Sequence, residues 1–168
     1  MTVSIIIPTK NEESNIERLL KSIRSQSLKN FEIIIVDNFS QDKTLKIAKK
    51  FTKKVFQFGP ERSSQRNLGL QKAKGTYIMF IDADMELEQE VISDSVKTLD
   101  KNHNVSGIII KEVSKGSSFL TKVKALEKNL LTGKKPAWPS SARSAKKKCS
   151  NCLGSKFIKS IKFLEMYL

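Results

Sequence analysis

Residues 77–85 read YIMFIDADM, an apolar run that ends in two aspartates, Asp82 and Asp84. A run this apolar, just after Gly75, is typical of a strand buried on both faces, as in parallel sheets. Residues two apart in a strand point the same way, so both carboxylates are expected to converge on one site. The alternative is a solvated acidic turn, because three glutamates follow within the next six residues.

The position of these carboxylates predicts a cation site. Open α/β sheets bind their ligands outside the carboxyl ends of the strands. Two hard oxygen ligands side by side suit Mg²⁺ or Mn²⁺ that also binds a substrate diphosphate. Asp82 and Asp84 are therefore candidate metal ligands.

Three further apolar runs precede this strand and alternate with helical patterns. The runs cover residues 3–7, 31–37 and 55–58. Pro8 is expected to end the first strand, Asn11 and Ser40 to cap the two following helices, and a third helix to cover about 63–74. This order and its short connections predict a Rossmann-like, doubly wound, mostly parallel α/β sheet with helices on both faces.

The pattern continues after the acidic turn as far as Leu131. Apolar residues have helical spacing over 91–99 and 119–131, and residues 105–113 are typical of a further strand. From about Thr132 the chain is rich in Lys and Ser and shows no core periodicity. We expect one domain over 1–131 and a basic tail over 132–168, either disordered or forming a short amphipathic helix.

Four segments resemble, in order and spacing, the amino-terminal half of a family 2 glycosyltransferase with the GT-A fold. They are SIIIPTKNEE at 4–13, IIVDNFS at 34–40, GPERSSQRNLG at 59–69 and AKGTYIMFIDAD at 73–84. The resemblance covers about the first two thirds of the chain. It implies an incomplete nucleotide-sugar-binding domain and metal-dependent, inverting transfer of a sugar from a nucleotide-diphosphate sugar to an acceptor hydroxyl, of the hexosyltransferase type.

The resemblance also assigns residues to the nucleoside. It places Pro8, Thr9, Asn11 and Glu12 against the base and ribose, and it gives Asp37 a hydrogen bond from the base. The alternatives are local, namely a capped helix start for the first four residues and turn initiation for Asp37. The position of Asp37 at the end of a strand favours binding.

Arg62 and Arg66 are candidates for the diphosphate, because a guanidinium can bind two phosphate oxygens at once. A helix that begins near Ser63 would add backbone donors. The alternative is that both arginines decorate a solvated face. The resemblance implies that Asp82 contacts the ribose or the metal, and that Asp84 coordinates the metal bridging the diphosphate.

No catalytic base can be named from the sequence. Inverting transfer needs a group that takes the proton of the acceptor hydroxyl, and the family uses an aspartate in an acidic segment well downstream of the D-x-D. After Asp100 the chain has no aspartate, and Glu127 and Glu165 lie in no such segment. His103, the single histidine, lies in a polar KNHN turn and is expected to be exposed to solvent.

Most of the net charge of +14 lies in the tail, where residues 112–168 hold 13 Lys and Arg against 3 Asp and Glu. We favour an out-of-frame or prematurely terminated translation. The alternatives are a basic membrane anchor with one apolar helical face over 157–168, or polyanion binding around 146–148. Cys149 and Cys152 lack a second ligand pair for zinc and are expected to be free thiols in a reducing compartment.

The absence of a signal-peptide pattern and of an 18-residue apolar run predicts a cytoplasmic protein. A tail helix would make it peripheral at the inner face of the membrane. The expected partners are a nucleotide-diphosphate sugar donor and a glycan or lipid-linked acceptor, with no specific nucleic acid. Two alternatives to an active transferase are an inactive nucleotide-sugar-binding fragment and a basic membrane- or polyanion-binding module.

Overall fold

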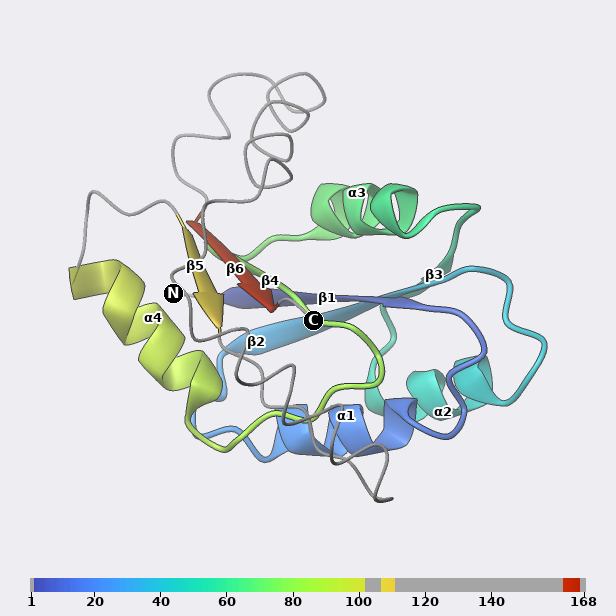
Figure 1. Ribbon diagram of the computed structural model, residues 1–168, viewed down its shortest axis with the longest axis horizontal. Helices are drawn as coiled ribbons and strands as arrows, with labels where there is room; N and C mark the ends of the chain where they lie inside the picture. Colours follow the sequence, from blue (N-terminus) through green and yellow to red (C-terminus); the bar gives the residue numbers. More distant parts are fainter. Residues whose placement is uncertain (1, 102–106, 111–161, 167–168) are drawn as a thin grey trace, which may run out of the picture. The chain divides into compact units, whose positions relative to one another are not determined.

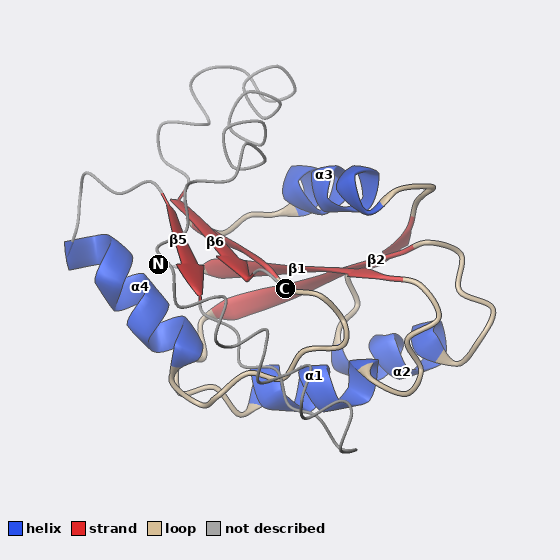
Figure 2. Ribbon diagram, in the orientation of Figure 1, coloured by secondary structure: helices blue, strands red, loops and turns tan. Residues whose placement is uncertain are grey.

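The computed structural model describes residues 2–101, 107–110 and 162–166, and it shows strands alternating with helices (Figures 1 and 2). The elements are β1 Val3–Thr9, α1 Ile16–Arg24, β2 Phe31–Asp37, α2 Thr44–Phe51, β3 Val55–Gln57, α3 Arg62–Lys72, β4 Tyr77–Phe80, α4 Val91–Lys101, β5 Gly107–Ile110 and β6 Lys162–Met166. Within the described ranges, no helix combines the length and the apolar character needed to cross a membrane.

The strands form one six-stranded sheet in the order β3-β2-β1-β4-β6-β5. Every neighbouring pair is parallel. Because Val3 of β1 lies opposite both Phe31 and Tyr77, the first, second and fourth strands begin at the same edge. The predicted Rossmann-like, doubly wound sheet is confirmed.

Helices cover both faces of the sheet (Figure 2). α1, α2 and α4 pack on one face, where they enclose alternate residues of β1 in a core that includes Ile5, Leu20 and Leu99. α3 packs on the other face (Figure 1). The backbone of α3 lies very close to β1 at Gly69, because a Cβ on this glycine would lie 2.3 Å from Ile6 Cγ2.

β1 continues beyond its predicted end because Pro8 lies inside the strand. β4 pairs with β1 only as far as Ile6 opposite Phe80, and Ile81 N–H then donates to Ile6 O at 3.1 Å. Residues two apart in a parallel strand face the same neighbour, so Pro8 faces the side where pairing has ended. Its missing N–H therefore breaks no ladder hydrogen bond.

Both predicted helix caps are wrong. α1 begins at Ile16, well after Asn11, and α2 begins at Thr44, well after Ser40. Asn11 adopts a left-handed φ of 54°, which is not the conformation of an N-cap. The first turn of α2 is held instead by Asp42, whose Oδ1 accepts a hydrogen bond from Thr44 N–H at 2.9 Å.

Residues 162–166 form β6, so neither of the alternatives for the tail, disorder or a short amphipathic helix, holds for this segment. This strand pairs with β4 on one side and β5 on the other, so its backbone forms the hydrogen bonds of a sheet instead of those of a helix. The predicted helix at 119–131, the histidine at position 103 and the two cysteines lie outside the described residues. The origin of the tail stays a prediction.

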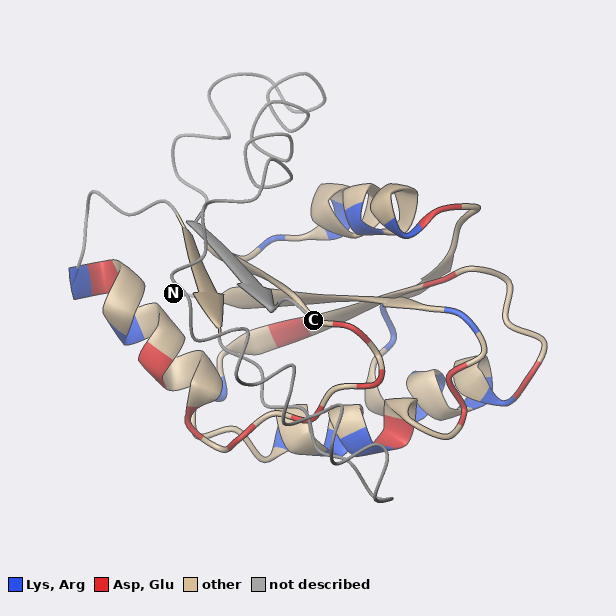
Figure 3. Cartoon of the chain, in the orientation of Figure 1, with Lys and Arg blue, Asp and Glu red and all other residues tan. Residues whose placement is uncertain are grey.

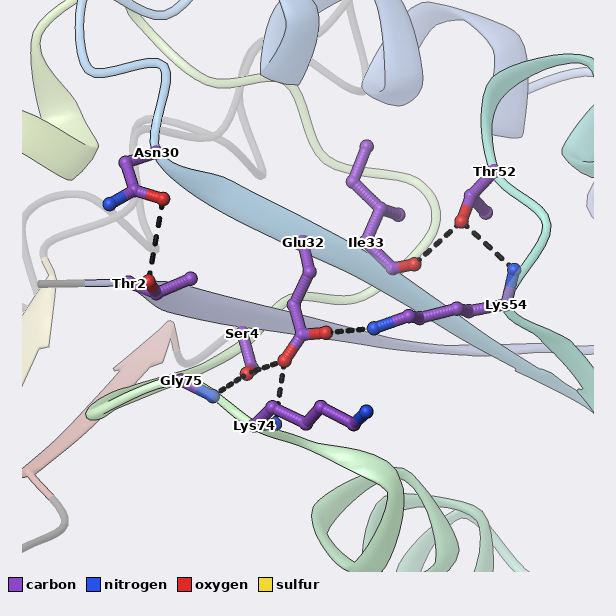
Figure 4. A network of polar contacts seen from close by, with 9 residues as sticks. All are labelled: Thr2, Ser4, Asn30, Glu32, Ile33, Thr52, Lys54, Lys74 and Gly75. Carbon is purple, nitrogen blue, oxygen red and sulfur yellow. Dashed lines mark hydrogen bonds and ion pairs between the residues drawn. The ribbon is translucent and has the colours of Figure 1, made fainter.

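Glu32 ties the amino ends of several strands together (Figure 4). Its carboxylate accepts hydrogen bonds from the Ser4 hydroxyl, from Lys54 Nζ and, at 2.6 Å, from Lys74 N–H. Ser4 Oγ in turn accepts from Gly75 N–H at 2.8 Å. One carboxylate thus joins β1, β2 and the segments that lead into β3 and β4.

The replacement Glu32→Gln is expected to lower the free energy of unfolding at pH 7 by about 1–2 kcal/mol. Burial by itself would raise the pKa of Glu32, but hydrogen bonds from Lys54, Ser4 and the Lys74 N–H outweigh it and hold the pKa below 4.5. The ionised form therefore contributes stability above pH 4.5, and this contribution is lost as the pH falls through the lowered pKa.

Urea unfolding of the wild type and Glu32→Gln at several pH values checks this prediction. The difference between their free energies of unfolding should narrow steadily as the pH falls below 4.5. Glu88→Gln, which changes an exposed carboxylate, is the control and should match the wild type throughout. A Glu32→Gln deficit that is independent of pH would contradict the linkage.

Candidate functional site

The predicted site residues gather at the carboxyl edge of the sheet. Thr9 ends β1 opposite Asp37, which ends β2, and the segment after Phe80 of β4 reaches the same edge. Pro8 is the last residue but one of β1, and the loop from 10 to 15 follows it. Doubly wound sheets bind their ligands in the crevice outside this edge.

Asp37 is fully buried and holds the turn that follows β2. Its Oδ1 accepts hydrogen bonds from Thr9 Oγ1 at 2.9 Å and from the Ser40 hydroxyl, and its Oδ2 accepts from Ser40 N–H at 2.8 Å. These contacts match the turn role that the local pattern predicts. A hydrogen bond from a nucleobase to Asp37 stays a prediction, and the carboxylate is enclosed by its own chain.

The loops that follow β1 and β2 hold each other through reciprocal hydrogen bonds. Asn11 N–H donates to Ser40 Oγ at 2.8 Å, and Asn11 Oδ1 accepts from Gln41 N–H at 2.9 Å. Glu12 N–H donates to Thr44 Oγ1 at 2.8 Å. Further bonds of this kind join Glu13 to Asp42 at 3.0 Å and to Lys43 at 2.9 Å. Asn11 and Glu12 therefore join the two loops into one wall at the carboxyl edge of the sheet.

Phe39 is an exposed aromatic residue in this wall. Its φ is 50° and 57% of its surface is exposed. A left-handed backbone at a bulky residue costs roughly 1–3 kcal/mol and persists only where its surroundings enforce it. Sequence reasoning missed Phe39, although an aromatic residue inside the VDNFS turn was the available signal.

Arg62 and Arg66 converge on Asp82. Arg62 Nη1 lies 3.0 Å from Asp82 Oδ2, and Arg66 Nη2 lies 3.1 Å from Asp82 Oδ1. The Asp82 side chain is 9% exposed, whereas that of Arg62 is 62% exposed. The Arg66 guanidinium also lies over the Phe80 ring, 5.6 Å from its centroid. A single carboxylate thus orients two guanidinium groups at the start of α3.

Asp82 and Asp84 do not share the strand geometry that the sequence predicts. β4 ends at Phe80, and Met85 N–H then donates to Asp82 O at 3.3 Å, which forms a turn. Asp82 is buried, whereas Asp84 is exposed. Arg18 Nη2 donates to the backbone oxygen of Asp84 at 3.0 Å and steadies this turn. The prediction is wrong because the strand ends two residues before Asp82.

The fit to a divalent cation rests on Asp84. Across 2–101, 107–110 and 162–166, no group of three or more His, Cys, Asp or Glu side chains is placed to hold a metal ion. Mg²⁺ is usually held by one or two carboxylates together with substrate phosphates. The exposed carboxylate of Asp84 fits that mode, whereas both oxygens of Asp82 already accept hydrogen bonds from arginines.

Gln65, a residue that sequence reasoning missed, fixes α3 to the edge of the sheet. It is buried, and its Nε2 donates to Thr9 O at 3.0 Å and to Val36 O at 2.6 Å. This contact sets the first turn of α3, and with it Arg62 and Arg66, against the ends of β1 and β2. The available signal in the sequence was that a glutamine directly precedes Arg66, a candidate site residue.

Comparisons with known proteins identify relatives of this chain. The family model described as Glycosyl transferase family 2 matches residues 4–160. The chain is 34% identical over 115 residues to the poly(ribitol-phosphate) beta-N-acetylglucosaminyltransferase TarS of Staphylococcus aureus, covering 62% of this chain and 20% of TarS. It is 30% identical over 144 residues to the GalNAc(5)-diNAcBac-PP-undecaprenol beta-1,3-glucosyltransferase of Campylobacter jejuni, covering 79% of this chain and 46% of that protein.

A solved structure shows the same fold. The crystal structure of S. aureus TarS 1–349 in complex with UDP-GlcNAc matches with a TM-score of 0.61 and 32% identity, over 70% of this chain and 36% of that one. The chain spans less than half the length of these curated relatives. Because the family model covers most of its residues, the chain belongs to glycosyl transferase family 2.

Proposed function

We propose that the chain binds a nucleotide-diphosphate sugar at the carboxyl edge of its sheet, for inverting transfer of the sugar to an acceptor hydroxyl. The convergence of Arg62 and Arg66 on Asp82 carries this proposal. Guanidinium groups held in place by a carboxylate suit a diphosphate. The relatives support it, since two of them are named as sugar transferases and TarS was solved with UDP-GlcNAc.

In this proposal the chain's own residues bind and orient the donor. Arg62 and Arg66 hold the diphosphate, and the amino-terminal end of α3 adds a favourable dipole. Asp82 keeps both guanidinium groups in position. Asp84 would hold Mg²⁺ or Mn²⁺ together with the diphosphate, and such a cation neutralises charge on the leaving nucleoside diphosphate.

The nucleoside lies, in this proposal, against the wall formed by the loops after β1 and β2. Asp37 is enclosed by hydrogen bonds from its own chain, whereas Phe39 exposes a large ring from the same turn. We therefore assign the face of the base to Phe39, because aromatic rings stack on bases whatever the base is.

The replacement Phe39→Ala is expected to weaken UDP binding by about tenfold, since stacking on one base contributes roughly 1–3 kcal/mol. Calorimetric titration with UDP measures the change. Phe58→Ala is the matched control, because Phe58 is a second exposed phenylalanine, 43% exposed, just after β3. Equal losses in both variants, or none in Phe39→Ala, would remove Phe39 from the site.

The proposed function is tested by titrating the full chain with UDP and GDP, with and without Mn²⁺. We expect binding that Mn²⁺ strengthens, and we expect Asp84→Asn to lose about tenfold or more of this metal effect. Asp94→Asn removes another exposed carboxylate, on α4, and should keep the metal effect. Failure to bind UDP or GDP in every condition would refute the donor site.

Turnover separates the proposed transferase from an inactive fragment that only binds donor. Both bind UDP, and only the transferase releases it from UDP-GlcNAc in the presence of an acceptor. For a basic polyanion-binding module we instead expect an affinity that falls steeply as the salt concentration rises and that does not depend on Asp82 or Asp84. The cytoplasmic, membrane-peripheral location stays a proposal, tested by fractionating cells that express the full chain.

A further inference from the structure

The charge of the described domain is polarised. Residues 43–54 hold six lysines and no carboxylate, whereas residues 82–94 hold six carboxylates and no lysine or arginine. Figure 3 shows Lys and Arg on α2 and Asp and Glu along the loop that follows β4. The proposed donor site uses Asp82 and Asp84 of the acidic segment, and it uses none of the lysine side chains of residues 43–54.

A cavity of about 430 Å³ lies beside the carboxyl-terminal end of α2. Its cationic lining comprises Arg24, Lys49, Lys50, Lys53 and Lys54, and its one carboxylate is that of Glu32. The Glu32 carboxylate pairs with Lys54, so it does not neutralise the other four cations. The cavity is therefore strongly cationic, and it has the size of a pocket for a small organic ligand.

The apolar part of the lining includes Phe31 and Phe51, both half-buried. Arg24 donates a hydrogen bond to the backbone oxygen of Phe51 at 2.5 Å, which holds the end of α1 against the end of α2. The cavity thus combines aromatic surface with cationic side chains. A bare inorganic anion would use only the cations, whereas an organic phosphate would use both.

The cavity is remote from the proposed donor site. Phe31 and Glu32 begin β2, whereas the donor site lies at the other end of that strand. The six residue steps from Phe31 to Asp37, at about 3.3 Å each, separate the two by roughly 20 Å. One local explanation for the cations is that Arg24, Lys49 and Lys50 lie in the last turns of α1 and α2, where helix dipoles favour them. That explanation does not cover Lys53, which follows α2.

We propose that this cavity is a second anion site that binds an organic phosphate, with the phosphate among Lys49, Lys50 and Lys53 and the organic part against the phenylalanines. The same chemistry is offered by a soluble phosphate ester and by the headgroup of an anionic phospholipid. The site is independent of the proposed function, because none of its residues lines the donor site.

The test uses the full chain and the triple variant Lys49→Gln, Lys50→Gln, Lys53→Gln. The probes are glycerol 3-phosphate in solution, vesicles of phosphatidylcholine, and vesicles of phosphatidylcholine with phosphatidylglycerol. We expect the triple variant to bind the phosphate probe that the wild type binds, either glycerol 3-phosphate or the vesicles with phosphatidylglycerol, on the order of 100-fold more weakly, at about 1 kcal/mol per lysine. A loss on vesicles alone identifies a headgroup, and a loss in solution identifies a soluble ester.

The matched control is Lys21→Gln, Lys72→Gln, Lys97→Gln, which removes the same charge from exposed lysines outside the cavity. This control should stay within about threefold of the wild type, because these lysines feel the ligand only through screened solvent. Equal losses in both triple variants would show that binding depends only on net charge, and would overturn the site. The absence of binding to every probe would overturn it as well. UDP titration of both variants should be unchanged, which separates this site from the donor site.

Discussion

Replacing Arg66 by alanine is expected to lower the affinity of the chain for UDP by about 2–3 kcal/mol, or roughly 30- to 150-fold. Arg66 is 24% exposed and is held between the Asp82 carboxylate and the Phe80 ring. Its removal takes away a positioned cation and leaves the buried carboxylate of Asp82 with Arg62 as its remaining arginine partner. Both changes act against an anionic ligand at this edge.

Two further variants separate charge from geometry. Arg66→Lys keeps the charge but replaces a planar fork by a point charge, so it should recover only part of the affinity. Lys72→Ala removes an exposed cation from the same helix and should bind UDP as the wild type does. Calorimetric titration measures all three, with thermal unfolding as the check on folding. Wild-type affinity in a folded Arg66→Ala variant would show that the arginines only decorate the surface.

The sequence predicted the sheet because its strands are continuous apolar runs. The runs at 31–37 and 77–80 pair in parallel with β1, and residues 33–37 and 77–80 are buried, as such runs require. It also predicted that Arg62 and Arg66 lie near the carboxyl edge, because α3 begins within one residue of its expected start. These predictions depend on local composition, which determines burial and helix position directly.

The predictions that failed depend on contacts between distant residues. Asn11 and Ser40 have the composition of helix caps, yet they bind the opposite loop about 30 residues away. The segment 157–168 has a helical apolar pattern, yet its residues 162–166 pair with strands far earlier in the chain. A cap rule or a periodicity rule reads only neighbouring residues, so it cannot detect such partners.

The candidate site was predicted as a set of residues rather than as a geometry. The pattern left Asp37 between a binding and a turn role; its burial and its three internal hydrogen bonds establish the turn role, whereas the binding role stays a prediction. Asp82 and Asp84 were expected side by side, but the early end of β4 gives them different surroundings. The end of a strand depends on where its neighbours stop pairing, which composition does not reveal.

Replacing Gly75 by alanine is expected to destabilise the fold by about 3 kcal/mol. A Cβ at this position would lie 2.6 Å from Thr2 O, 2.7 Å from Ser4 N and 2.7 Å from Ser4 Oγ. Two of these atoms belong to the backbone of β1 or of the residue before it, so no side-chain rotation relieves the overlap. The segment must move away from β1, which also breaks the hydrogen bond from Gly75 N–H to Ser4 Oγ.

Gly69→Ala provides the contrast, because it also places a Cβ too close to β1 but meets only the side chain of Ile6, at 2.3 Å. Ile6 is a fully buried β-branched residue, so this overlap also costs packing energy, but alanine gains about 1 kcal/mol over glycine inside a helix such as α3 and offsets part of that cost. Its net cost should therefore be clearly smaller. Thr76→Ala, at an exposed neighbour of Gly75, should be near neutral.

Urea unfolding followed by circular dichroism measures the three variants, with the midpoint expected to fall most for Gly75→Ala and the slope to stay constant. Gly75 lies at the amino edge of the sheet, next to the Glu32 network, whereas UDP is expected at the carboxyl edge. The fraction of Gly75→Ala that remains folded should therefore bind UDP with unchanged affinity. A Gly75→Ala variant as stable as Thr76→Ala would show that the segment before β4 shifts freely, and that the close packing against β1 contributes little to the fold.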